Sequence, residues 1–212
     1  MNARIDLHRM RNPQLDAPLS PKALDARRIE ALFTEIGERL NARGVVAEFA
    51  VFGGSALALT FDFRDATMDV DYMPVSEDLT DLREVAAEMA QEKGLASDWL
   101  NDAVAMFKSE HARHEWFGDF PPDKPGLRVF VALPTYLLAM KIMAMRSSLE
   151  TNDVRDVWYL LDELDVRDVS HAMEIVARYY PNGKFPARNA LVLEDIFSAK
   201  QRGREYSKEL GW

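Results

Sequence analysis

The residues with the clearest chemical potential are a glycine–serine run and two nearby aspartates. Gly53-Gly54-Ser55 follows an apolar segment, and Asp69 and Asp71 come later, separated by one residue. Two glycines let a backbone approach a ligand closely, and a serine at a helix start offers a hydroxyl and amide hydrogens to a phosphate. Carboxylates that alternate along a strand share one face, where they suit Mg²⁺. A metal held there would polarise a phosphate and activate an attacking hydroxyl.

Each of these features also has an ordinary structural explanation. A glycine pair after a strand commonly forms only a turn, and an Asp-x-Asp pair commonly lies on the solvated face of a strand. The order strand, Gly53-Gly54-Ser55, helix, strand, Asp69 and Asp71 is more specific than either part alone. The main structural alternative is therefore an exposed edge strand that happens to carry both carboxylates.

Hydrophobic periodicity predicts the elements that position these residues. Ser20-Pro21 is an N-cap signal followed by apolar residues at helical spacing, which predicts a helix over residues 21–43. Apolar runs predict buried strands over residues 45–52 and 127–133. Alternation predicts a strand over residues 68–73, with Asp69 and Asp71 on one face and Met68, Val70 and Tyr72 on the other. We expect Gly53-Gly54-Ser55 to form a turn and residues 56–60 a short helix.

The rest of the chain is mostly helical in pattern. We expect a long helix that starts near Leu79 and stops at Gly94, a third helix capped by Ser97 that carries Trp99, and a short strand near Trp116. Further helices are expected over residues 134–146, 153–164, 169–180 and 187–202. The predicted class is α+β, with a mixed sheet flanked by helices in residues 1–133 and a helical part in residues 134–212 packed on this core.

Composition excludes several classes of protein. The 212 residues include no cysteine, which removes disulfides, thiolate zinc sites and cysteine nucleophiles and fits a reducing compartment. No apolar run reaches the ~18 residues of a membrane span, and the polar start lacks a signal-peptide core. We therefore expect a cytoplasmic protein with no membrane partner. A net charge of −9 counts against non-specific binding of long nucleic acid and is compatible with a basic protein partner.

The spacing of these residues resembles that of a known family. The pattern consists of Gly53-Gly54-Ser55-Ala56-Leu57, followed by Arg64, Thr67, Asp69 and Asp71. It is similar to that of the minimal nucleotidyltransferases. Within them it most resembles the AbiEii-type toxin group and its uncharacterised relatives, which share Gly-Gly-x-Ala-Leu followed by Arg-x-x-Thr-x-Asp-x-Asp. The similarity continues in the helix with Lys141, in Arg146, and in the Asp-x-x-Asp pair Asp153 and Asp156, and also in Trp99-Leu100-Asn101. It covers roughly residues 45–161.

The resemblance implies a nucleotidyltransferase fold and a set of residue roles. Asp69 and Asp71 would hold Mg²⁺, for which Mn²⁺ is a substitute, and Lys141 would steady a triphosphate. The nucleotide site would also include Gly53, Gly54, Ser55, Arg64, Thr67, Asp153 and Asp156. Asp69, Asp71 and Lys141 form the predicted catalytic set. The implied reaction is attack of an acceptor hydroxyl on the α-phosphate with release of pyrophosphate.

Three of these residues have structural alternatives, and one family feature is missing. Lys141 lies on an apolar helix, where its stem would cross the edge of the core, and Asp153 and Asp156 open a helix whose dipole they would compensate. Many nucleotidyltransferases carry a third carboxylate on a later strand, but residues 127–133 contain none. Asp119, Asp153 and Asp156 are the alternatives for it.

Two functional hypotheses follow. In the first, the chain transfers a nucleoside monophosphate from a nucleoside triphosphate to a tRNA-like RNA end or to a protein. The resemblance implies that such an enzyme serves as a toxin paired with an antitoxin-like protein, or in phage defence. An RNA acceptor would need a local basic patch, for which Arg146, Arg155 and Arg188 are candidates. In the second, a degenerate nucleotidyltransferase only binds a nucleotide or a partner protein.

Overall fold

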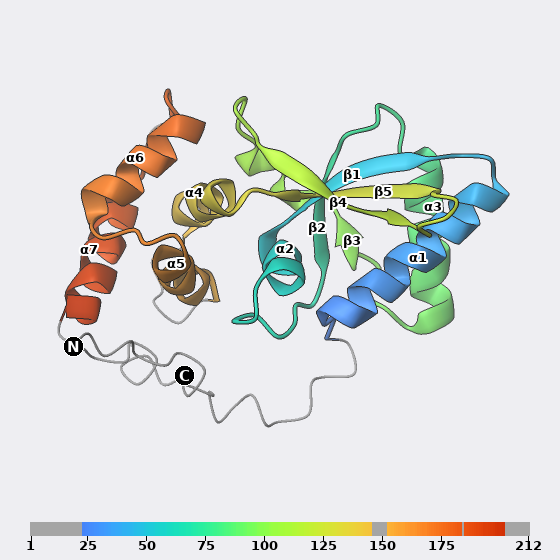
Figure 1. Ribbon diagram of the computed structural model, residues 1–212, viewed down its shortest axis with the longest axis horizontal. Coiled ribbons are helices and arrows are strands. Elements are labelled where there is room, and N and C mark those ends of the chain that lie inside the picture. Colours follow the sequence, from blue (N-terminus) through green and yellow to red (C-terminus); the bar gives the residue numbers. More distant parts are fainter. Residues whose placement is uncertain (1–22, 146–151, 184, 202–212) are drawn as a thin grey trace.

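The computed structural model describes residues 23–145, 152–183 and 185–201, and it shows an α+β chain (Figure 1). Its mixed sheet has five strands in the order β3-β2-β1-β5-β4. The strands are β1 (Ala47–Phe52), β2 (Val70–Pro74), β3 (Leu100–Asn101), β4 (His114–Phe120) and β5 (Leu127–Ala132). The helices are α1 (Ala26–Ala42), α2 (Gly53–Thr60), α3 (Thr80–Lys93), the 3₁₀ helix η3 (Ala103–Phe107), α4 (Pro134–Ala144), α5 (Asn152–Glu163), α6 (Val169–Tyr179) and α7 (Ala187–Gln201). The predicted α+β class is confirmed.

Strand β1 forms the centre of the sheet. It pairs antiparallel with β2 and parallel with β5. Phe49, Val51 and Phe52 are almost completely buried, as a strand covered on both faces requires. The register places Phe52 opposite Asp71. The end of β1, from which α2 continues, therefore lies beside one of the two predicted carboxylates.

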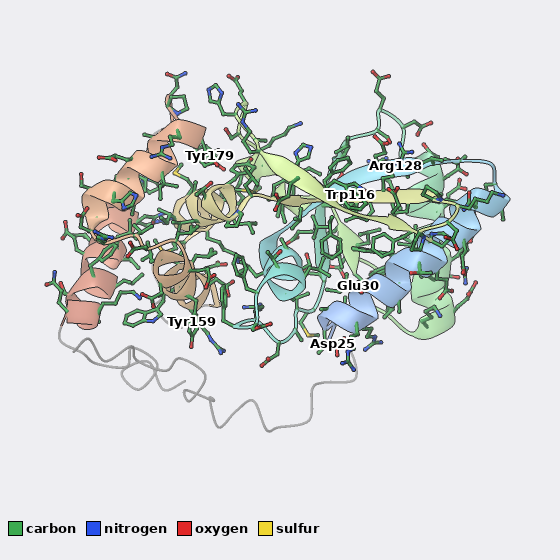
Figure 2. The ribbon with its side chains drawn as sticks, in the orientation of Figure 1. Asp25, Glu30, Trp116, Arg128, Tyr159 and Tyr179 are labelled. Atoms are coloured by element: carbon green, nitrogen blue, oxygen red, sulfur yellow. The ribbon has the colours of Figure 1, made fainter. Side chains whose placement is uncertain are left out.

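Helix α1 begins later than predicted. Asp25 is its N-cap, and the carboxylate accepts a hydrogen bond from the backbone N–H of Arg28 at 2.8 Å (Figure 2 labels Asp25). The helix therefore starts at Ala26, whereas Ser20-Pro21, the cap signal read from the sequence, lies outside the described residues. The apolar face that includes Ile29 and Phe33 is buried as its spacing predicted.

The third helix expected after Ser97 is wrong. Leu100–Asn101 instead forms β3, which pairs in parallel with Val70 and Asp71 at the edge of β2, and only the 3₁₀ turn η3 follows. Trp99 anchors this strand: its indole N–H donates to the carbonyl of Ala86, and its own carbonyl accepts from Val70. Backbone groups at the β2 edge need partners, and this long-range pairing overrides the local helical spacing.

The strand that carries the carboxylates is shorter than predicted, and the glycines are not a turn. Strand β2 begins at Val70, so Asp69 precedes it, and Met68 is 54% exposed instead of lying on the buried face. Val70 and Tyr72 are buried as expected. Gly53-Gly54-Ser55 forms the first turn of α2. The two carboxylates thus sit at the start of β2, next to the start of a helix.

The four helices from Pro134 onward follow the sequence prediction within a few residues. Figure 1 shows α6 and α7 at the opposite end of the molecule from α1 and α3, with α4 and α5 between them and the sheet. The side-chain amide of Asn189 donates to the carbonyl of Ile142 at 2.7 Å, which fastens α7 to the end of α4. None of the helices in the described part of the chain is long and apolar enough to cross a membrane.

Candidate nucleotide and metal site

Gly53 is required where β1 gives way to α2. Its φ of +61° lies in the left-handed region, which favours glycine. A Cβ atom at this position would lie 2.1 Å from Asp71 Oδ2, so a side chain and the carboxylate cannot occupy this space together. The sequence analysis expected Gly53 to let the backbone approach a ligand. In the structure, the absence of a side chain at Gly53 makes room for the carboxylate of Asp71 on the adjacent strand.

Gly54 makes a second close approach of the same kind. A Cβ there would lie 2.8 Å from Thr67 Oγ1 and 3.1 Å from an Arg64 guanidinium nitrogen. Ser55 behaves differently from the prediction, because it is fully buried and its hydroxyl donates to the carbonyl of Phe52 at 2.8 Å. The Ser55 hydroxyl therefore stabilises the first turn of α2 and does not face the surface.

Asp69 and Asp71 lie close enough to repel each other. Burial raises the pKa of Asp71 to about 6, and the negative charge of Asp69 adds to this rise. The ammonium of Lys141 and the side chain of Asn101 both lower the pKa of Asp71 and so act in the opposite direction. Asp69 itself accepts from the Thr67 hydroxyl at 3.3 Å. The pair is thus a half-buried centre of negative charge.

A buried ion network connects this centre to the helical part. Asp156, whose side chain is 1% exposed, accepts from Arg64 Nη1 at 2.9 Å and lies 2.9 Å from Lys141 Nζ. The second contact is an ion pair and not an aligned hydrogen bond. Lys141 Nζ also donates to Asp153 Oδ1 at 2.7 Å. Asp156 therefore joins a cation from the α2–β2 loop to a cation from α4.

Charge balance in this network keeps Lys141 protonated. Burial alone would lower the pKa of Lys141, but the carboxylates of Asp156 and Asp153 outweigh it and raise the pKa above its ordinary value. Among the described residues the site contains four carboxylates (Asp69, Asp71, Asp153 and Asp156) and two cations (Arg64 and Lys141), and their formal charges sum to −2. A divalent cation would neutralise this charge before a triphosphate arrives.

Asp69 and Asp71 fit the requirements of a magnesium ion. Mg²⁺ is commonly held by one or two carboxylates together with waters and substrate phosphates. Burial is the main cause of the raised pKa of Asp71, and a cation between the two carboxylates would remove the further rise that repulsion from Asp69 causes. Within the described residues there is no group of three or more His, Cys, Asp or Glu side chains arranged around one metal position. The remaining ligands would then come from water and substrate.

The alternatives for a third carboxylate occupy different places. Asp119 lies on β4, which is separated from the strand of Asp71 by β1 and β5. Its partner Arg128 on β5 pairs with Glu48, which is four positions before Phe52, the residue opposite Asp71. Four positions along a strand correspond to about 13 Å. Asp153, in contrast, acts electrostatically on Asp71. Of the alternatives, Asp153 is therefore in the site and accessible, Asp156 is in it but buried, and Asp119 is outside it.

Sequence reasoning assigned no role to two contributors to the site. Asn101 was named only as part of a resembling segment, but the pairing of β3 with β2 places it beside Asp71, where its side chain lowers the pKa of that carboxyl. Tyr159 on α5, labelled in Figure 2, stacks on Phe63 with 5.0 Å between ring centroids, and Phe63 stacks on Phe61. This stack fastens the loop that carries Arg64 to α5 beside the Arg64–Asp156 ion pair.

Two of the three arginines proposed for a basic patch lie within the described residues, on different helices. Arg155 lies over the ring of Tyr159 at 5.8 Å, Arg188 is exposed on α7, and Arg146 lies outside the described residues. Nine of the residues predicted for the site, in contrast, form one connected cluster: Gly53, Gly54, Arg64, Thr67, Asp69, Asp71, Lys141, Asp153 and Asp156. No protein-family model, curated protein or solved structure matches the chain.

Proposed function

We propose that the chain is a nucleotidyltransferase, of the nucleotidyltransferase fold, that moves a nucleoside monophosphate from a nucleoside triphosphate to a hydroxyl of an RNA or protein acceptor. The observation that carries this proposal is the contact between Gly53, at the start of α2, and Asp71, in the strand beside it. It places a helix N-terminus, which attracts phosphate, directly against a carboxylate pair that suits a divalent cation. Lys141 and Arg64 supply the positive charge nearby.

The proposed roles divide between binding and positioning. Asp69 and Asp71 would hold Mg²⁺ or Mn²⁺, which when bound supplies Lewis-acid polarisation of the α-phosphate. Lys141 stays protonated and pairs with Asp153, which is partly exposed, so a phosphate can replace that carboxylate as its partner. Asp156 is buried and holds both cations, and we assign it a positioning role instead of contact with the nucleotide.

The reaction would be a single displacement at phosphorus. A bond forms between the acceptor hydroxyl oxygen and the α-phosphorus, the bond from that phosphorus to the β-phosphate oxygen breaks, and pyrophosphate leaves. The hydroxyl proton goes to Asp153 or to solvent, because Asp153 is the partly exposed carboxylate of the cluster that pairs with Lys141. Binding and orientation supply most of the catalysis in such a site. A cytoplasmic toxin with an antitoxin-like partner is the biological setting that the sequence resemblance favours.

A second candidate is a nucleotide-binding or partner-binding protein without transferase activity. It is favoured by Ser55, whose buried hydroxyl is committed to Phe52, and by the partnering of Lys141 with two carboxylates. Both features leave less of the cluster available to a triphosphate. The two candidates differ in whether a labelled nucleotide is transferred to another molecule.

Calorimetric titration tests the shared site. The purified chain is titrated with each of the four nucleoside triphosphates, with and without Mg²⁺, and the Asp69→Ala/Asp71→Ala double variant is the control. Mg²⁺-dependent binding that the double variant loses supports the site and identifies the nucleotide. Equal binding by both proteins, or no binding by the folded wild-type chain, overturns the assignment. Transfer of an α-labelled nucleotide to an acceptor then separates the enzyme from the binding protein.

A further inference from the structure

A small pocket is lined in part by Asp69. It measures about 140 Å³ and lies between Leu24 and the turn that joins α3 to β3. Leu24, at one wall, exchanges backbone hydrogen bonds with Thr67, two residues before Asp69. Trp99 and Leu95 also line the pocket. The pocket therefore opens next to the place where the reaction would occur.

The lining of the pocket is apolar inside and acidic at the rim. Leu24 and Trp99 are almost completely buried, whereas Met68 is 54% exposed at the edge. Asp69 and the exposed Asp98 supply the charged groups, and no lysine, arginine or histidine is among the described lining residues. Phosphates need cations or backbone donors, so this pocket is unsuited to the backbone of a nucleic acid. It is suited to an apolar stem that ends in a positive charge.

Size restricts the occupant further. Pockets that enclose a drug-sized ligand measure about 300–1,000 Å³. A pocket of about 140 Å³ is large enough for one amino-acid side chain and too small for a whole nucleoside. A lysine or arginine side chain has the required apolar stem and charged head. The net charge of −9 of the chain also favours a basic protein partner.

We propose that this pocket anchors a lysine or arginine side chain of a protein acceptor, whose neighbouring serine, threonine or tyrosine hydroxyl is the group modified at Asp69 and Asp71. The inference rests on the proposed function for the transfer step, while the anchoring itself does not depend on it. The basic head pairs with Asp98, because Asp69 is engaged in the site. The hydroxyl oxygen then bonds to the α-phosphorus, pyrophosphate leaves and the hydroxyl proton passes to solvent. The product is a phosphodiester on the acceptor side chain.

Peptide binding without nucleotide tests the anchor. The probe is a fluorescein-labelled peptide of alternating lysine and serine, and its match has glutamate in place of lysine. We expect fluorescence anisotropy at fixed ionic strength to show binding of the lysine peptide alone. Asp98→Lys, and separately Met68→Lys at the rim, should weaken this binding about tenfold or more, because like charges across an interface are strongly unfavourable. Glu174→Lys, at an exposed position on α6, changes the net charge by the same amount as Asp98→Lys and should leave the binding of the lysine peptide within about twofold.

The outcomes separate failure of the anchor from failure of the transferase. Equal peptide binding by Asp98→Lys and Glu174→Lys, or no binding of the lysine peptide, overturns the anchor even when Mg²⁺ and nucleotide bind normally. Labelling of an RNA oligonucleotide but not of the lysine–serine peptide by an α-labelled nucleotide also overturns it and leaves the proposed function intact. Pocket-dependent peptide binding together with absent Mg²⁺–nucleotide binding supports the anchor and removes the transferase instead. Transfer of label to the peptide, lost in Asp98→Lys, supports both.

Discussion

The carboxylate of Asp71 lies in the space that a side chain at Gly53 would fill. Its Oδ2 atom is 2.1 Å from the position of a Cβ at Gly53, and the register of β1 and β2 holds the two together. The glycine is thus tied to the position of the carboxylate as well as to the start of α2. This relationship allows the site to be altered from either partner.

Gly53→Ala should damage the site through both backbone and contact. The left-handed φ of +61° costs an alanine about 1–2 kcal/mol, and the new Cβ displaces the Asp71 carboxylate. We expect a lower free energy of unfolding in urea and loss of Mg²⁺-dependent nucleotide binding.

Gly44→Ala is the matched control for this change. Gly44 has a similar φ of +74°, but a Cβ there has no atom within 4 Å. It should lose only the backbone contribution, about 1–2 kcal/mol, and bind nucleotide normally. If the two variants bind nucleotide equally well, the contact between Gly53 and Asp71 is not important for the site.

Asp71→Asn should stabilise the metal-free protein at neutral pH. The pKa of Asp71 is raised from 3.8 to about 6, so the folded chain disfavours its charged form. Between about pH 4 and 6 the Asp71 carboxyl holds its proton in the folded state but has lost it in the unfolded state. The free energy of unfolding therefore falls as pH rises through this range. Asparagine removes this cost, up to about 3 kcal/mol at about 1.4 kcal/mol per pKa unit.

Thermal unfolding measures this difference directly. Without metal, Asp71→Asn should melt above the wild-type chain at pH 7.5, and the difference should shrink as pH falls toward 4. Added Mg²⁺ should raise the melting temperature of the wild-type chain and not that of the variant, because only the wild-type site binds it. A variant that melts below the wild type at pH 7.5 would mean that the carboxylate is structural.

Asp156 should be the most important acidic residue for stability. Its buried carboxylate is shared by Arg64 and Lys141, and Asp156→Ala leaves both cations without it. Breaking a buried pair from one side costs about 3–5 kcal/mol. Asp102→Ala removes only a pair with Arg83 in which both side chains are more than half exposed, and it should cost at most about 1 kcal/mol. Comparable losses of the two variants in urea unfolding would contradict the central role of Asp156.

The sequence predicted the elements of the fold that depend on local periodicity. β1, β5, α3 and the four C-terminal helices lie close to their expected bounds because burial follows the spacing of apolar residues along the chain. The prediction for β3 was wrong because Trp99 and Leu100 also suit a helix. Pairing with the edge of β2 is what makes this segment a strand instead. Such pairing depends on a distant segment and leaves no mark in the local pattern.

The sequence pattern predicted which candidate residues lie near one another, but not the direction of every side chain. The order of glycines and carboxylates along the chain grouped Gly53 with Asp71, and the family resemblance added Lys141, which acts electrostatically on Asp71. Ser55 was misjudged because a serine in a first helical turn can face either solvent or the preceding carbonyl, and here it bonds Phe52. Asp156 suited compensation of the α5 dipole, yet burial against two cations decides its role.

Lys141→Gln should weaken triphosphate binding selectively. Lys141 remains protonated, and replacement of Asp153 by a phosphate at its ammonium would form a charge-assisted hydrogen bond. Such bonds contribute about 1.5–3 kcal/mol, so affinity for the triphosphate should fall roughly ten- to hundredfold, with little change for the monophosphate. Binding of Mg²⁺ alone should not weaken, because removal of a positive charge leaves the site more negative. Calorimetry with both nucleotides measures this, with Lys200→Gln, a lysine paired with Asp162 on another helix, as the control. Equal weakening of monophosphate and triphosphate would place Lys141 among the structural residues, where its stem crosses the edge of the core and its ammonium holds α4 to α5.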